Sequence, residues 1–200
     1  MNARNKLVYG VGVNDSDYVT KKRINGKQVC CPIFRKWQSM LERCYCPKYH
    51  AKQPTYIDCT VAPEWRSFMT FKAWMITQDW AGKELDKDII KKGNKVYSSS
   101  FCLFVDKNTN SLLNEMKATR GAYPIGVNIE KRNGTFKSQV SFRNDTKNLG
   151  SYSTPEAAHL AYRKVKAAIV QLTAYKQKDS RVKEALLQRA YSIGALGDLT

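Results

Sequence analysis

Residues 127–158 carry the pattern that most constrains how this chain can fold. Apolar and polar residues alternate from 127 to 130 and again from 136 to 143, and Asn133-Gly134 between them is a typical hairpin turn. A third strand-like segment follows at 149–152. Thr154-Pro155-Glu156 then suits a helix start, with a hydroxyl cap, an early proline and an acid near the positive helix end. The pattern predicts a three-stranded antiparallel sheet followed by a helix.

The two faces of such a sheet should differ, because successive side chains of a strand point to opposite sides. The side chains expected beneath the helix are Val127, Ile129, Val140, Phe142 and Leu149. The side chains expected on the uncovered face are Asn128, Glu130, Lys137, Gln139, Ser141 and Asn148, with Arg132, Arg143 and Lys147 near its rim. A polar face of this size can enter a major groove, where such side chains contact base edges. An ordinary solvated face is the alternative interpretation.

The rest of the chain has a mixed pattern. We expect a hairpin around Asn25-Gly26, helices from Pro32 to about Tyr45 and from 63 to about 78, and a strand near 85–90. Gly121 and Pro124 indicate a boundary. The expected fold class is therefore α+β. It comprises an N-terminal module (1–119) containing a ββα unit, the sheet-and-helix module (120–176) and a last helix within 177–200.

Charge is the strongest global signal for function. The chain has 34 Lys and Arg against 17 Asp and Glu, a formal net charge of +17. Residues 1–119 carry +9 and residues 120–200 carry +8, so the excess lies on folded parts and not on a tail. An excess of this size favours a polyanionic partner, most commonly nucleic acid, over the alternative of a merely solubilising surface.

Other features restrict the compartment and the metal chemistry. No apolar run approaches the ~20 residues of a membrane span, and residues 1–9 lack the apolar core of a secretory signal. We therefore expect a cytoplasmic protein without a membrane partner. The six cysteines form no C-x-x-C pair, so free and mostly buried thiols are expected and zinc is not.

Several short motifs in the C-terminal half occur together in one known family. Tyr123-Pro124-Ile125-Gly126-Val127, Phe136 to Val140, Leu149 to Ala158 and Ala161-Tyr162 follow in order, and residues 120–175 thereby resemble an AP2 domain. That family binds double-stranded DNA through its sheet. The positions that the resemblance implies as groove-facing are Asn128, Glu130, Arg132, Gln139, Ser141, Thr146 and Asn148. Arg132 is the single arginine among them and tryptophan is absent, which predicts weaker base contacts. Phosphate contacts would then dominate, from Lys131, Lys137, Arg143 and Lys147.

A second resemblance covers residues 85–110. This stretch is similar to a diverged HNH nuclease core, which in phage proteins is often fused to an AP2 module. The resemblance implies Asp86 or Asp88 as a carboxylate ligand and Asn110 as the distal ligand of Mg²⁺. Lys87, however, occupies the place of the general-base histidine, and an ammonium with a reference pKa of about 10.4 does not accept a proton at neutral pH.

Three functions follow from these observations. The first is a phage-type protein that binds double-stranded DNA, and the most specific version of this hypothesis is a Mg²⁺-dependent HNH-type endonuclease. The second is a DNA-binding regulator without catalysis. The third is a phage inhibitor that binds a host nucleoprotein or defence complex in the host cytoplasm. The DNA target, the oligomeric state and the host partner are left open by the sequence.

Overall fold

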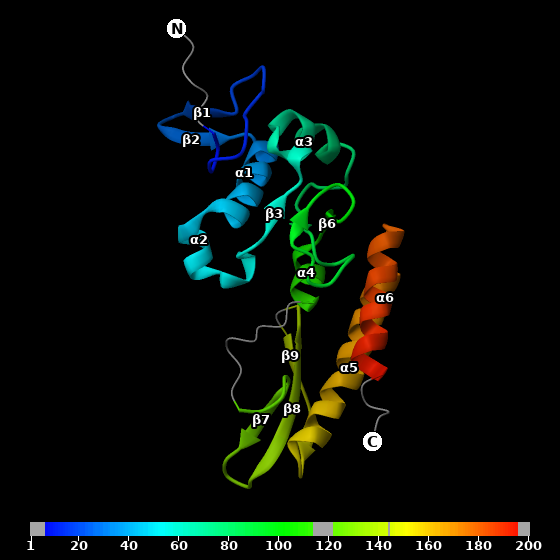
Figure 1. The fold of residues 1–200 in the computed structure, drawn as a ribbon. Helices are drawn as coiled ribbons and strands as arrows, with labels where there is room; N and C mark the ends of the chain where they lie inside the picture. Colours follow the sequence, from blue (N-terminus) through cyan, green and yellow to red (C-terminus); the bar gives the residue numbers. More distant parts are fainter. Residues whose placement is uncertain (1–6, 114–121, 144, 196–200) are drawn as a thin grey trace. The chain divides into compact units, whose positions relative to one another are not determined.

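The computed structural model describes residues 7–113, 122–143 and 145–195, and its chain divides into two compact units (Figure 1). The first unit is Met1–Asp106 and the second is Lys107–Thr200. Both contain helices and small sheets, so the predicted α+β class is confirmed. The predicted boundary between residues 119 and 120 lies outside the described residues.

The first unit consists of short elements connected by tight turns. Its strands are β1 (Lys21–Ile24), β2 (Lys27–Cys30), β3 (Thr60–Val61), β4 (Glu84–Asp86), β5 (Val96–Tyr97) and β6 (Leu103–Val105). Its helices are α1 (Pro32–Tyr45), α2 (Pro47–Lys52), η1 (Pro54–Tyr56), η2 (Pro63–Arg66) and α3 (Phe68–Met75). The strands form three two-stranded sheets: β1 with β2 and β4 with β6 are antiparallel, and β3 with β5 is parallel.

Aromatic side chains of α1, η2 and α3 form the core of this unit. Trp37, Trp65, Phe68 and Phe71 are all at most 1% exposed. The indole N–H of Trp37 donates to the carbonyl of Trp65 at 2.8 Å, so the polar atom of this ring is satisfied inside the core. Trp65 and Phe68 therefore belong to the buried core of the first unit.

The continuous helix predicted for residues 63–78 is wrong, because it is interrupted at Ser67. Ser67 has an extended backbone, and its Oγ accepts the amide N–H of Thr70 at 3.1 Å as the N-cap of α3. Its hydroxyl also donates to the carboxylate of Asp15 at 2.6 Å, and that carboxylate accepts the N–H of Met69. A partner 52 residues away in the chain therefore supports the break.

The second unit contains the predicted sheet and helix (Figure 1). Its elements are α4 (Lys107–Leu113), β7 (Val127–Glu130), β8 (Thr135–Phe142), β9 (Asp145–Tyr152), α5 (Pro155–Tyr175) and α6 (Ser180–Ala195). The sheet is antiparallel with β8 in the centre. Helix α5 begins at the predicted place, because Thr154 Oγ1 accepts the N–H of Ala157 at 3.2 Å.

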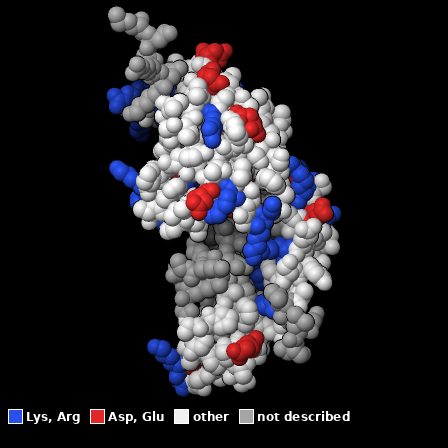
Figure 2. Space-filling model, in the orientation of Figure 1, with Lys and Arg blue, Asp and Glu red and all other residues white. Residues whose placement is uncertain are grey.

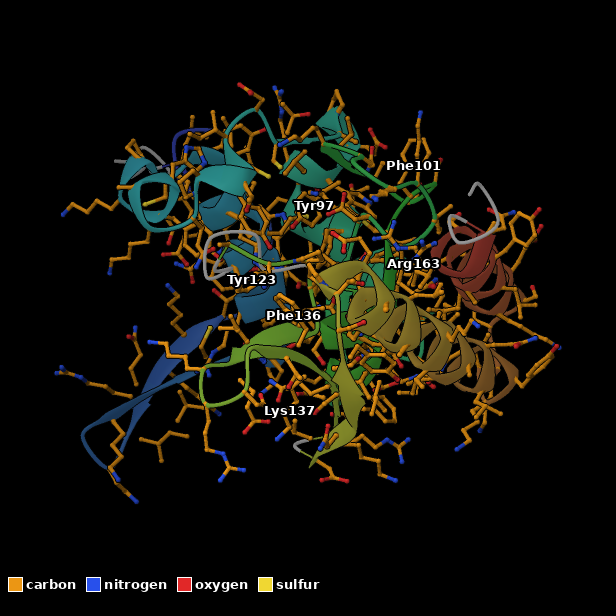
Figure 3. The ribbon with its side chains drawn as sticks, turned by 90° about the horizontal axis from the view of Figure 1, so that it is seen from below. Tyr97, Phe101, Tyr123, Phe136, Lys137 and Arg163 are labelled. Carbon is orange, nitrogen blue, oxygen red and sulfur yellow. The ribbon has the colours of Figure 1, made fainter. Side chains whose placement is uncertain are left out.

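One face of the sheet packs on α5, and α6 packs on α5 in turn. Val127 and Val140 of the sheet and Tyr162 of α5 are buried. Gly126 has a φ of +83°, and a Cβ placed there would lie 2.2 Å from the ring of Tyr162. The approach of the sheet to α5 at this point therefore requires glycine. Arg163, labelled in Figure 3, donates from Nε to the carbonyl of Ile193 at 2.8 Å and ties α5 to α6.

Within the described residues, no helix combines the length and the apolar character needed to cross a membrane.

Candidate nucleic-acid interface

The register of the second unit's sheet collects polar side chains on the face opposite α5. Residues paired directly across antiparallel strands lie on the same face of a sheet. The pairs on this face are Asn128 with Lys137, Glu130 with Thr135, Gln139 with Asn148, and Ser141 with Thr146. The six polar residues predicted to share a face therefore do so, together with Thr146. We call this surface the open face, and Lys137 on it is labelled in Figure 3.

The opposite alternation places apolar residues toward α5, as predicted. Val127 is 7% exposed and Val140 is 4% exposed, and Ser138 of β8, which pairs with Val127, is fully buried. Ile129 differs, since it remains 38% exposed although it pairs with Phe136 on the helix side. It lies on β7, an edge strand of the sheet, on which α5 packs less extensively than on β8 or β9.

Two hydrogen bonds orient side chains of the open face. The hydroxyl groups of Ser141 and Thr146 lie 2.7 Å apart across β8 and β9. The side-chain oxygen of Asn148 accepts the N–H of Gly150 at 3.1 Å, beside the irregularity in the β8–β9 pairing. This bond fixes the amide of Asn148, so that the side chain can offer its N–H donors to a ligand.

The turn between β7 and β8 adds positive charge next to the open face. Lys131 and Arg132 are both exposed in this turn, which is closed by a bond from the N–H of Gly134 to the carbonyl of Glu130 at 2.9 Å. Asn133 accepts the N–H of Thr135 through its side chain, as expected for a turn asparagine. Figure 2 shows basic side chains at the end of this turn.

Arg143 and Lys147 occupy a different place from the other predicted phosphate contacts. Lys147 pairs with Val140, so it lies on the helix side of the sheet and not on the open face. The guanidinium of Arg143 lies over the ring of Phe142 at 5.1 Å. Both residues line a cavity of about 390 Å³ between the sheet and α5, together with Val140, Phe142, Asp145, Val165 and Ile169. A phosphate contact from these two residues would therefore come from the sheet edge.

The predicted nuclease carboxylates both have structural partners in the first unit. Asp86 Oδ1 accepts the backbone N–H groups of Asp88 and Ile89, each at 2.7 Å. These bonds turn the chain at the end of β4, which explains why the strand predicted for 85–90 ends at Asp86. Burial raises the pKa of the Asp86 carboxyl above its usual range, while the two amide bonds oppose the rise.

Lys87, at the position where the HNH resemblance would place the general-base histidine, is buried and has a structural role. Its side chain is enclosed, with the residue only 6% exposed, and Nζ donates to Asp88 at 2.6 Å and to the carbonyl of Asn94 at 2.8 Å. The side chain of Asn94 donates back to the carbonyl of Lys87 at 2.9 Å. These reciprocal bonds hold the loop between β4 and β5. Asp88 thus balances the charge of the lysine that it follows.

The third predicted ligand, Asn110, lies on α4 and belongs to the second unit. Asp86 and Asp88 lie in the first unit. Across residues 7–113, 122–143 and 145–195, no three His, Cys, Asp or Glu side chains converge as a metal ion would require. The six cysteines are free thiols, and burial raises the pKa of Cys44 and Cys102 to about 12.

Both histidines are engaged by backbone carbonyl groups. His50 Nε2 lies 2.8 Å from the carbonyl oxygen of Arg43, and His159 Nδ1 lies 2.9 Å from that of Ile125. Each ring joins two segments of its own unit. These contacts give both histidines a structural place that does not depend on catalysis.

No family model, no curated protein and no solved structure matched the chain. The function therefore has to be inferred from the surfaces of the chain itself.

Proposed function

We propose that this protein binds double-stranded DNA through the open face of the β7–β8–β9 sheet. The observation that carries the proposal is the strand register, which gathers polar side chains of all three strands on one face that α5 leaves uncovered. The resemblance of residues 120–175 to an AP2 domain supports the same surface.

The dimensions of the sheet suit a major groove. Two strand spacings of about 4.8 Å make a backbone width of about 10 Å, and a major groove is about 12 Å wide. Gln139 and Asn148 lie opposite each other on neighbouring strands, and amide side chains can form paired hydrogen bonds with adenine. Lys137 pairs with Asn128 and supplies a cation on the same face. This face therefore offers both hydrogen-bond donors and charge to a duplex.

Charge supports the same ligand. Residues 107–200 hold 16 Lys and Arg against seven Asp and Glu, a net formal charge of +9. Lys131 and Arg132 extend the positive surface beyond the sheet, where the backbones of a bound duplex would lie. Binding should consequently weaken with salt, because each neutralised phosphate releases counterions.

We propose that the protein binds DNA without catalysing a reaction on it. Asp86 supports a turn and Asp88 balances Lys87, so each predicted carboxylate ligand has a role that needs no metal. The Mg²⁺-dependent endonuclease and the phage inhibitor of a host nucleoprotein stay predictions from the sequence.

The test measures binding of the full chain to a random pool of duplexes and to sequences selected from that pool. The double variant Gln139→Ala with Asn148→Ala removes both amide side chains. The free-energy preference for the selected sequence should fall by about 1–3 kcal/mol for each base that such an amide contacts through two hydrogen bonds. Lys178→Ala is the control, because it removes an exposed lysine that lies outside the sheet, between α5 and α6. Binding and preference unchanged by the sheet variant would refute the proposal.

A further inference from the structure

The β1–β2 hairpin is the most exposed regular element of the first unit. Seven of its eight strand residues are exposed, and only Cys30 is partly buried. A lone two-stranded hairpin is marginally stable in water, since it buries little apolar surface. In Figure 3 this dark blue ribbon extends away from the helices of its own unit. Packing within the unit therefore does not account for the residue types found in the hairpin.

The hairpin is strongly cationic. Lys21, Lys22, Arg23 and Lys27 lie in it, and no acidic residue occurs between Asp17 and Glu42. Figure 2 shows basic side chains in the region of the hairpin. Among the ion pairs formed by described residues, none involves the hairpin cations. Four like charges on a small ribbon repel one another, so this arrangement favours a polyanionic ligand.

The register separates the hairpin into two different faces. Arg23 pairs with Gln28 on one face, beyond the pair of Lys21 and Cys30. Lys22 pairs with Val29, and Ile24 pairs with Lys27, on the other face. The ammonium group of Lys21 lies 5.4 Å from the centre of the Phe34 ring, at the base of the hairpin. Arg23 and Gln28 are thus the pair nearest the tip on the first face.

The tip of the hairpin is narrow and well defined. Asn25 and Gly26 have φ values of 50° and 74°, as in the two-residue turn that matches the twist of paired strands. No loop widens the end of the ribbon, because Ile24 and Lys27 pair directly beside the turn. A major groove admits a two-stranded ribbon of this kind.

We infer that the β1–β2 hairpin is a second contact to duplex DNA, in which Arg23 and Gln28 face the base edges of a major groove. Arginine pairs with guanine and glutamine with adenine through two hydrogen bonds each. Lys22 and Lys27, on the opposite face, extend along the ribbon to the phosphates on either side of the groove. The inference rests on the proposed function for the choice of ligand, but on residues that the proposed sheet interface does not use.

The test uses the full chain and a 20-base-pair duplex, with dissociation constants measured over a range of salt concentrations. Lys22→Ser with Lys27→Ser should lower the slope of log affinity against log salt by about two, at about 0.9 per phosphate contact. The matched control is Lys48→Ser with Lys52→Ser, which removes two exposed charges of α2 in the same unit. A slope equal to that of the control would overturn the inference.

Two further variants separate this inference from the proposed function. Arg23→Ala with Gln28→Ala should change the preferred sequence, a result that mere loss of positive charge does not produce. Lys137→Ala with Gln139→Ala tests the open face alone. If only the open-face variant loses binding, the hairpin inference is wrong and the proposed function stands. If only the hairpin variants lose binding, the proposed function is wrong and the hairpin contact stands. All the substituted hairpin residues are exposed, so we expect the melting temperatures of the hairpin variants to equal that of the parent chain. Equal melting temperatures show that the variants fold.

Discussion

The open face of the β7–β8–β9 sheet and the β1–β2 hairpin are both polar β-surfaces, but their polarity has different causes. The sheet buries its other face against α5, so the alternation of Val140 with Gln139 and Ser141 already follows from folding. Seven of the eight strand residues of the hairpin are exposed, so folding makes little demand on Arg23 or Lys27. An exposed cationic ribbon is consequently the more specific sign of binding, while the sheet offers the larger surface.

The largest expected difference between the two regions is in the unfolding free energy lost when a glycine is replaced, Gly126 before β7 or Gly26 at the hairpin tip. Gly126→Ala combines a positive φ with a Cβ only 2.2 Å from Tyr162, so the sheet must move from α5. We expect a loss of about 3 kcal/mol or more in the free energy of unfolding. Gly26→Ala has a similar φ but open space around the Cβ, and should cost about 1 kcal/mol. Denaturant unfolding monitored by circular dichroism measures both, and equal losses would contradict the comparison.

Two valines give the next largest contrast. Val140→Ala removes buried methyl groups beneath α5 and should cost about 2 kcal/mol of unfolding free energy. Val29→Ala changes a side chain that is 42% exposed and should cost less than about 0.5 kcal/mol. The same unfolding measurement applies. A large loss for Val29→Ala would mean that the hairpin is packed against something and is not a free ribbon.

Lys131 and Arg132, in the turn between β7 and β8, test whether the sheet and the hairpin bind DNA independently. Lys131→Ala with Arg132→Ala should lower the salt slope of DNA binding by about two. Combined with Lys22→Ser and Lys27→Ser, the reductions in binding free energy should add to within about 0.5 kcal/mol, because separate sites without shared partners are additive. Titration of the combined variant checks this. Strong non-additivity would indicate that the two sets of cations compete for the same phosphates.

The smallest effect is expected at Asp86, which belongs to neither surface. Its folded pKa is raised, so the folded state binds this proton more tightly than the unfolded chain does. The contribution of Asp86 to stability is therefore greatest below the unfolded value of 3.8, and it falls as the pH rises through the raised folded value. Asp86→Asn keeps an oxygen that can accept both turn bonds, and it should remove this pH dependence. Melting temperatures of the variant and the parent chain, compared from acid to neutral pH, measure the difference.

The same variant tests the endonuclease prediction. A binding function without catalysis predicts that the full chain with Mg²⁺ leaves supercoiled plasmid intact, and that Asp86→Asn changes nothing. Nicking that appears with Mg²⁺ and disappears in Asp86→Asn would instead favour the HNH-like assignment.

Local rules of sequence account for much of the second unit. Asn133-Gly134 lies in the turn predicted between β7 and β8, Thr154 caps α5, and the two-residue period places Gln139 and Val140 on opposite faces. Each of these results depends on residues within a few positions of one another, or on one repeating geometry. The sequence therefore sufficed for the sheet, its helix and most of the candidate interface.

The interior of the first unit depended on residues far apart in the chain. Asp15 supports the break at Ser67, and Lys87 is buried because Asn94 and Asp88 satisfy its ammonium group. The pattern of residues 85–90 does not show that the carboxylate of Asp86 is used in a turn. Burial of a charge is decided by all the groups that surround it, and those groups come together only in the tertiary structure.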